Sequence, residues 1–319
     1  MTGTRRNTLG AHLGMLIRAL ILGLSFTLVG LMSAGLPPLM LTALRFAIGA
    51  ITLLPLVWRT RAGLPGLPGI ALYTILGSCQ AAFFAAMFWV AHRTSALSMA
   101  VLYVSVPFLA YCLGLGFRVE QPSTSLLGIL ALGAAGALGL AWAQHGRVLG
   151  GLQLGAPEAV YFVGCMGLAF YSVLSRWGLS RRWLSESAAA RTFFSLAIGT
   201  VLVGILGLLH EEPHALAHVK LSDALLLAYL GVFSTGGTFW LMQRAAAVLT
   251  PAAVTAYSYA PPFVSMLLLF ITQPQSISWL WLPGALLVVL AMALLLRRDT
   301  ALSLGHSRAP SSISSTGAR

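Results

Sequence analysis

The stretch Ile70–Ala91 reads IALYTILGSCQAAFFAAMFWVA, a run of 22 residues without one charged side chain. An α-helix rises about 1.5 Å per residue, so a helix of this length crosses the ~30 Å hydrocarbon core of a bilayer. A membrane β-strand would alternate apolar and polar residues, whereas this run is apolar on every face. The stretch therefore predicts a transmembrane α-helix.

Similar runs fill most of the chain. Short breaks separate them, such as Gly35-Leu36-Pro37-Pro38, and Pro, Gly and charged residues in these breaks end helices. The fold class we expect is an all-α integral membrane protein with ten transmembrane helices. Their expected ranges are Met15–Met32, Leu39–Trp58, Ile70–Ala91, Leu97–Phe117, Ser125–Trp142, Ala156–Leu174, Ala188–Leu209, Leu221–Met242, Pro251–Thr272 and Ile277–Leu296.

The composition agrees with this class and excludes others. Hydrophobic residues make up 58% of the chain and charged residues 8%, whereas soluble domains carry about 25% charged residues. A disordered chain would need low hydrophobicity and high charge. The net charge of +12 comes from basic residues that stand singly or in pairs, without the basic patch that nucleic acid needs. The three cysteines match neither a disulfide framework nor a metal site, so we expect packing roles for them and no cofactor.

The distribution of Lys and Arg predicts the orientation, because cytoplasmic loops carry an excess of these residues. With the N-terminus inside, thirteen of the 19 basic residues fall in cytoplasmic segments and three in outer loops. The remaining three, Arg18, Arg45 and Arg191, lie within predicted helices. We therefore expect both termini in the cytoplasm. We also expect Arg18 to extend along its helix toward the cytoplasmic surface, and Arg191 to lie at the interface.

The chain also resembles itself. Thr42–Phe46 matches Ala188–Thr192 at an offset of 146 residues, which places an Arg in the second helix of each copy. Three further landmarks, Gly77, Tyr103 and Pro107, recur at an offset of 154 as Gly231, Tyr257 and Pro261. Each copy contains five predicted helices, and because five is odd the second copy enters the membrane in the opposite sense. Inverted repeats of this kind place a binding site at the midplane, between the two halves.

The repeat divides the chain into parts. We expect a cytoplasmic N-terminus over 1–13, a first five-helix repeat over 14–142, a linker over 143–154 and a second five-helix repeat over 155–298. The Ser-, Gly- and Arg-rich remainder, 299–319, is expected to be a disordered cytoplasmic tail.

Several local patterns resemble the EamA domains of the drug/metabolite transporter superfamily. They are the Ser25-Phe26 pair in the first helix, Arg45-Phe46 early in the second, and the segment from Ala96 through Tyr103 to Pro107. The resemblance covers about 14–298. The family often ends the fourth helix of a copy with Gly-Glu. This chain has Val119-Glu120 in the first copy and no acid at the matching place of the second.

The resemblance implies a ten-helix secondary carrier in the inner (plasma) membrane of a bacterium. Its central cavity would be lined by the first, third, fourth, sixth, eighth and ninth helices. It favours export of amino acids, metabolites or drug-like compounds. The residues that we expect to line the cavity and bind substrate are Ser25, Gln80, Phe84, Phe88, Tyr103, Tyr171, Thr235, Trp240, Tyr257 and Tyr259.

A second set of residues is expected to shape the helices. Arg45 either faces the cavity as a positive charge or caps broken helix ends, and its recurrence as Arg191 favours the structural role. Prolines in mid-helix remove backbone hydrogen bonds, which is tolerated in a membrane only where protein or a cavity satisfies the freed carbonyls. Small residues in a row likewise weaken a helix. The expected hinge and structural residues are Arg45, Pro107, Arg191, Gly236, Gly237 and Pro261.

Other functions receive less support from the sequence. His210, His214 and His218 are spaced by four, as zinc ligands on one helix face would be, but Pro213 interrupts that helix, so we assign no metal site. A polytopic membrane enzyme is the alternative, although no catalytic constellation is recognisable. No Gly-rich phosphate loop precedes a Lys-Ser/Thr pair, so we expect no use of ATP.

The predicted helices carry no acid near mid-membrane. Proton-driven carriers commonly place Asp or Glu there, and a cationic substrate would need one as a partner. We therefore expect a neutral, zwitterionic or weakly anionic small molecule with an apolar or aromatic body. It would move down its own gradient or by exchange.

Overall fold

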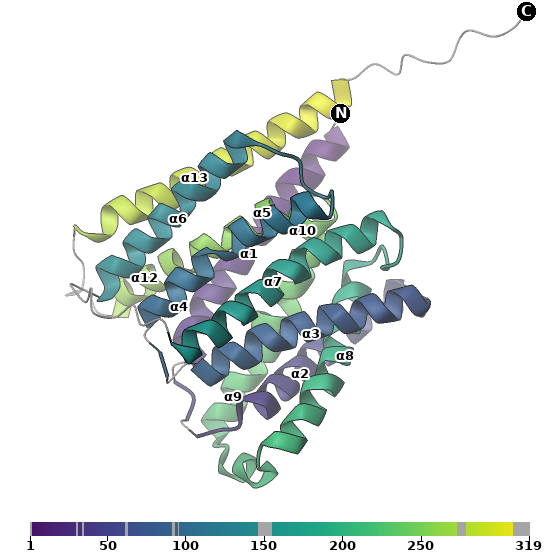
Figure 1. The fold of residues 1–319 in the computed structure, drawn as a ribbon, viewed down its shortest axis with the longest axis vertical. Helices are drawn as coiled ribbons and strands as arrows, with labels where there is room; N and C mark the ends of the chain where they lie inside the picture. The colour runs from purple at the N-terminus through teal and green to yellow at the C-terminus, as the bar shows by residue number, and fades with distance from the viewer. Residues whose placement is uncertain are drawn as a thin grey trace, which may run out of the picture.

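The computed structural model describes residues 2–29, 31–33, 35–60, 63–90, 93–94, 96–145, 155–272 and 279–308. Throughout these ranges the regular structure is helical. The uninterrupted long helices are α1 (Thr2–Val29), α2 (Pro38–Thr60), α3 (Leu67–Val90), α6 (Thr124–His145), α7 (Ala156–Ser180), α8 (Ala188–His210) and α13 (Trp281–Arg308). They pack into one bundle (Figure 1).

Three further segments are helices with an interruption. The first is α4 (Ala96–Val104) followed by α5 (Val106–Gly116), and the second is α9 (Leu221–Tyr229), the π-helical segment η3 (Leu230–Gly237) and α10 (Thr238–Ala246). The third consists of α11 (Pro251–Ala256), the 3₁₀ turn η4 (Tyr257–Tyr259) and α12 (Ala260–Thr272). A short 3₁₀ helix, η2 (Pro213–His218), connects α8 to α9.

The length and apolar character of these helices establish an integral membrane protein. In the described ranges, seven helices are long and apolar enough to cross a membrane, and Val101–Gly116 is a shorter apolar helix. The seven are α1, α2, α3, α6, α7, α8 and the combined segment Leu221–Ala246.

The interruptions fall where the sequence predicted weakened helices. Pro107 lies in the first turn of α5, and Pro261 in the first turn of α12, so each proline follows a break instead of clashing within a continuous helix. The small residues Gly236 and Gly237 form the end of the π-helical segment η3, a type of distortion that often marks functional sites.

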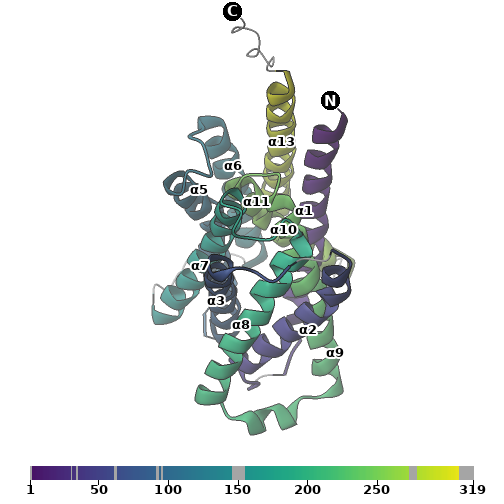
Figure 2. The same cartoon turned by 90° about the vertical axis from the view of Figure 1, so that its right-hand side faces the viewer.

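The two copies of the repeat pack against each other at two equivalent places. A Cβ atom on Gly77 of α3 would lie 2.7 Å from the carbonyl oxygen of Ser195 on α8. A Cβ atom on Gly231, its counterpart in η3, would lie 3.2 Å from the carbonyl oxygen of Arg45 on α2. The third helix of each copy therefore packs against the second helix of the other. Figures 1 and 2 show α2, α3, α8 and α9 gathered at one end of the molecule.

The fifth helices of the two copies pair in the same way. Helices α6 and α13 lie side by side along one edge of the bundle (Figures 1 and 2). Their backbones meet closely, since a Cβ atom on Gly136 would lie 2.9 Å from the carbonyl oxygen of Gly284.

Both ends of the chain depart from the expected boundaries. Helix α1 begins at Thr2 instead of Met15, and α13 continues to Arg308, so Asp299–Arg308 is helical and not disordered as predicted. Packing explains the extension, because Asp299 is half-buried and its Oδ2 lies 3.6 Å from Nε2 of His12 on α1. The start of α1 and the end of α13 lie at the same end of the molecule (Figure 2). The rest of the predicted tail, and the predicted linker from residue 146 to 154, lie outside the described residues.

Candidate functional site

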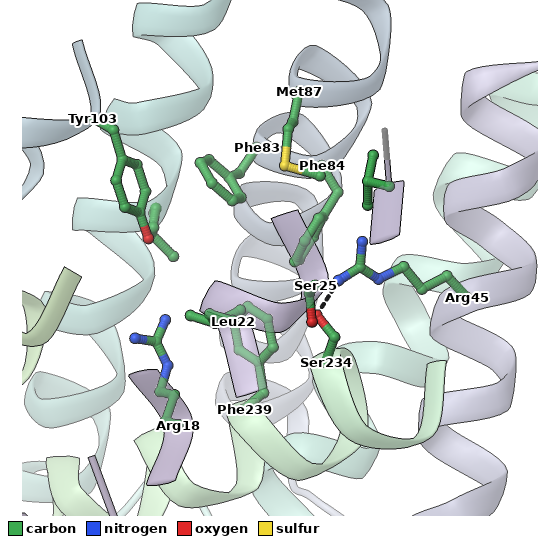
Figure 3. Close-up of a pocket in the computed structure, with 12 residues that line it drawn as sticks. Arg18, Leu22, Ser25, Arg45, Phe83, Phe84, Met87, Tyr103, Ser234 and Phe239 are labelled. Atoms are coloured by element: carbon green, nitrogen blue, oxygen red, sulfur yellow. Dashed lines mark hydrogen bonds between the residues drawn. The ribbon is translucent and has the colours of Figure 1, made fainter. Parts of the chain in front are cut away.

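A buried cavity lies near the centre of the bundle, between elements of both copies. Its volume is about 30 Å³, room for one or two water molecules. Helices α1 to α4 contribute most of the wall, and α7, η3 and α10 complete it. The lining residues are Arg18, Leu22, Ser25, Val29, Arg45, Phe83, Phe84, Met87, Tyr103, Leu168, Ser234 and Phe239 (Figure 3).

Arg45 joins α2 to the π-helical segment at this cavity. Its Nε donates a hydrogen bond to Thr235 Oγ1 at 2.5 Å, and its Nη2 donates one to Ser234 Oγ at 2.7 Å. The guanidinium carbon lies 4.3 Å from the centre of the Phe84 ring, a cation–π contact. Nη1 has no hydrogen-bond partner. The sequence left open whether Arg45 faces the cavity or holds helices together. In the structure Arg45 does both, because it lines the cavity and bonds α2 to η3.

Arg191, the counterpart of Arg45, lies in a different environment. Its Nε and Nη2 donate to the side-chain and main-chain oxygens of Gln243, and its Nη1 donates to the carbonyl oxygens of Ser185 and Glu186. Every nitrogen of this guanidinium is therefore satisfied by protein. The side chain is fully buried in protein, in the first turn of α8, and the expectation that it lies at the depth of the membrane interface stays a prediction. The loop before α8 bends back over the Arg191 side chain and supplies the carbonyl groups of Ser185 and Glu186.

Arg18 was expected to extend toward the cytoplasmic surface, and that interpretation is wrong. The residue is 4% exposed and lines the cavity, where it interacts with Tyr103. Figure 3 shows Arg18 and Tyr103 on one side of the cavity and Arg45 on the other. The spacing of Arg18, Leu22 and Ser25 by four and three residues places all three on one face of α1, a signal that the sequence did contain.

Aromatic rings form the apolar walls. The Phe84 ring contacts those of Phe83 and Phe239, with centroids 5.2 and 5.8 Å apart, and both contacts are edge-to-face. Phe239 also packs edge-to-face on Tyr171 at 5.2 Å. This cluster links α3 of the first copy to α7 and α10 of the second.

The residues predicted to line the cavity separate into three groups. Ser25, Phe84 and Tyr103 line it directly. Thr235 and Tyr171 do not line it but contact residues that do: Thr235 contacts Arg45, and Tyr171 contacts Phe239. The other five do not line the cavity: Gln80, Phe88, Trp240, Tyr257 and Tyr259. Of these, Phe88 and Trp240 are only half-buried.

The place expected for Trp240 is taken by Phe239. A π-helical turn brings residue i+5, instead of i+4, above residue i. Phe239 therefore follows Ser234 on the cavity side, and Trp240 turns away to stack with Arg244 at 5.1 Å. The sequence contained Phe239, but the phase of the helix could not be read from it.

Gln80 has an unusual environment. It is fully buried in α3, yet neither its Oε1 nor its Nε2 has a hydrogen-bond partner. Gly236, one of the predicted hinge residues, allows α2 and η3 to approach, because a Cβ there would lie 3.0 Å from the carbonyl oxygen of Gly49. Gly237 is less crowded, with a single atom, the carbonyl oxygen of Val232, at 3.5 Å from such a Cβ.

Tyr257 and Tyr259 occupy the break between α11 and α12. The Tyr257 hydroxyl is hydrogen-bonded to His12 Nδ1 at 2.7 Å, and His12 in turn lies beside Asp299. The Tyr259 hydroxyl donates to the carbonyl oxygen of Val104 at 3.4 Å, next to the break between α4 and α5. The two predicted breaks are therefore in direct contact.

All seven acidic residues of the chain lie away from the cavity; six of them lie at or near helix ends, and Asp299 lies within α13. Glu120 accepts a hydrogen bond from the first turn of α11, and Glu211 accepts two from the first turn of α2. Glu158 and Asp223 cap the starts of their own helices, where Glu158 also accepts from Thr94 and Asp223 from Ser33. Burial raises the pKa of Glu120 and raises that of Asp299 to about 6. In the described ranges no three His, Cys, Asp or Glu side chains could hold a metal ion.

Sequence comparison places this architecture in a family. The EamA-like transporter family matches residues 9–142 and 158–297, one stretch in each copy of the repeat. The chain belongs to the EamA-like transporter family. It is therefore a membrane transporter of the drug/metabolite type, as the sequence resemblance predicted.

Individual relatives agree with this assignment. The protein named "Uncharacterized inner membrane transporter YedA" from Escherichia coli (strain K12) is 29% identical over 238 residues, which cover 73% of this chain and 72% of the relative. Its counterpart in Escherichia coli O157:H7 matches equally. A solved crystal structure with 19% identity superimposes with a TM-score of 0.71 and covers 91% of this chain and 97% of its own, which supports the fold.

Proposed function

We propose that this protein is a secondary transporter that moves a small organic solute by alternating access of its two inverted halves. One observation carries the proposal: the buried cavity is built from both copies. The first copy contributes Arg18, Arg45 and Phe84, and the second contributes Ser234 and Phe239. A site between inverted repeats can open to either side of the membrane when one half rocks against the other.

The helix interruptions supply places where such movement can occur. The breaks at Ser105 and at Tyr257–Tyr259 leave backbone groups outside regular helical bonding, and η3 carries its distortion next to the cavity. Hinges absorb conformational change at a few residues of this kind. Pro107, Gly236, Gly237 and Pro261 are the residues that we assign to them, whereas Arg45 and Arg191 hold the neighbouring helices in place.

We assign ten membrane crossings, because the segments α4–α5 and α11–α12 and the helix α13 are added to the seven long apolar helices, which already include Leu221–Ala246. Both termini then face the cytoplasm of a bacterial inner membrane. Thirteen basic residues in the expected cytoplasmic segments against three in the outer loops support this orientation. The name of the Escherichia coli relative supports the membrane. A C-terminal alkaline phosphatase fusion should be inactive, and a fusion at Pro213 active; the reverse pattern would exclude the assigned topology.

Transport is driven by the gradient of the solute or by exchange, because none of the seven carboxylates lines the cavity. Export is the direction that the sequence resemblance favours. The test is solute flux into proteoliposomes that contain the purified protein. We expect flux to follow the solute gradient and to change little with an imposed pH gradient. Accumulation driven by pH alone would contradict this mechanism.

A further inference from the structure

Two buried guanidinium groups with unsatisfied nitrogens face one cavity. Arg45 is 1% exposed and its Nη1 has no partner, and Arg18 is 4% exposed and its Nε has none. Both residues line the cavity, from α2 and α1 respectively, and Figure 3 shows their side chains reaching into it from opposite sides. Arg191 serves as an internal comparison, because protein atoms satisfy all of its nitrogens.

The protein provides no counter-charge for these two groups. All seven carboxylates lie within the described ranges, and none of them forms an ion pair with Arg18 or Arg45 there. A guanidinium group keeps its proton in proteins, so both charges persist. A buried ion without a counterion costs several kcal/mol. The Phe84 ring and two hydroxyl groups offset part of this cost at Arg45, but they carry no negative charge.

The rest of the lining sets what a ligand must look like. Leu22, Phe83, Phe84, Met87 and Phe239 form apolar walls, and the hydroxyl groups of Ser25 and Ser234 lie among them. A carboxylate pairs well with guanidinium nitrogens, and an apolar body would pack on the rings. An ammonium group would meet two like charges and no acceptor of opposite charge.

We propose that the cavity binds an organic anion, with its carboxylate held by Arg45 and Arg18 and its apolar or aromatic body held by the phenylalanine cluster. This inference rests on the proposed transport function and narrows its substrate class, since it excludes cations and ranks zwitterions below net anions. A volume of about 30 Å³ holds water but not such a solute. Loading therefore requires Phe84 and Phe239 to separate, which is the movement that the π-helical segment beside them allows.

The first test compares matched ligands on the unmodified, full-length protein in lipid nanodiscs. Phenylacetate and benzylsuccinate carry one and two carboxylates, phenylacetamide is the uncharged counterpart of phenylacetate, and L-phenylalanine is a zwitterion. Charged hydrogen bonds predict that phenylacetate binds about 10- to 150-fold more tightly than phenylacetamide. Equal or tighter binding of the amide, or of L-phenylalanine, would overturn the proposal without any variant being needed.

The second test removes each charge. Arg45→Gln and Arg18→Gln should each weaken phenylacetate binding by at least about tenfold and leave phenylacetamide binding nearly unchanged. Arg59→Gln is the matched control, because Arg59 is an exposed arginine at the far end of the same helix as Arg45. If Arg45→Gln does not fold, Arg18→Gln carries the charge-removal test, and Arg45→Lys, which keeps the charge, should retain the preference for phenylacetate over phenylacetamide. Anion binding that survives loss of either arginine would contradict the assigned site.

Exchange measurements separate this inference from the proposed function. Preloaded proteoliposomes that exchange phenylalanine or the amide, without preference for the anions, would support transport and overturn the anion site. Arginine-dependent binding of the anions without any exchange would support the anion site and overturn the transport function.

Discussion

Replacement of Gly77 by Ala tests the exchanged packing of the two repeats. The new Cβ would lie 2.7 Å from the carbonyl oxygen of Ser195, 2.8 Å from the amide nitrogen of Gly199 and 3.1 Å from its Cα. All three are backbone atoms of α8, so no side chain can rotate away and α3 must move. Overpacking of this kind costs about 1–3 kcal/mol.

The intrinsic preference of helices for Ala opposes that cost by about 1 kcal/mol. Gly128→Ala isolates this gain, because Gly128 lies on an exposed face of α6 and a Cβ there would meet nothing within 4 Å. We therefore expect Gly77→Ala to be less stable than Gly128→Ala by about 1–3 kcal/mol. Gly231→Ala should lose a similar amount of stability, since the new Cβ would lie 2.6 Å from Cβ and Cγ2 of Ile48, and the Ile48 Cβ moves only with the backbone of α2.

The assay is equilibrium unfolding of the purified variants in detergent micelles, followed by far-UV circular dichroism. Near-identical unfolding free energies for Gly77→Ala and Gly128→Ala would show that α3 and α8 do not approach as closely as described. A loss of stability in Gly128→Ala would instead show that the helix propensity of Ala is not a valid reference for the Gly→Ala variants of this protein.

Three further predictions concern buried polar groups and access to the cavity. Gln80→Met should raise the unfolding free energy by about 1–3 kcal/mol, because it removes two unsatisfied amide atoms; a decrease in denaturant titrations would show that Gln80 has partners in the native state. Burial raises the pKa of Asp299 to about 6 from 3.8, so the folded state binds the extra proton and the contribution of Asp299 to stability should fall as pH rises from about 4 to 6, by ~3 kcal/mol at most. The difference in unfolding free energy between the unmodified protein and Asp299→Asn should therefore change over this pH range, and a constant difference would refute this account. In a background without the native cysteines, Ser25→Cys should react with water-soluble thiol reagents and Leu127→Cys, which lies on the exposed face of α6, should not; the opposite order would exclude the assigned cavity.

Elements governed by local chemistry could be predicted from the sequence. Pro107 and Pro261 remove backbone hydrogen bonds wherever they stand in a helix, so both breaks were visible in advance. Arg45 was identifiable because a charge within an apolar run is costly. The inverted relation between the copies stays a prediction, which rests on the odd number of helices expected in each.

Side-chain direction could not be predicted in the same way. The π-helical turn shifts the phase of the helix after it, so that Phe239, five residues after Ser234, lines the cavity. The direction of Arg18 depends on its neighbours, because the same long side chain can reach a membrane surface or turn inward toward Tyr103. Asp299 was assigned to a tail because nothing local indicates that His12, far away in the sequence, covers it.

The contact between Arg45 and Thr235 has a consequence for how the protein is made. The two residues are 190 positions apart, so at about 5–20 residues per second the ribosome needs roughly 10 to 40 s to produce the second after the first. During that interval α2 is already synthesised while the hydroxyl groups that will receive its guanidinium do not exist. We expect the nascent first half to depend on the insertion machinery or on lipid headgroups to shelter this charge. A truncated first half expressed alone should therefore be degraded quickly, and co-expression of the second half should prolong its lifetime.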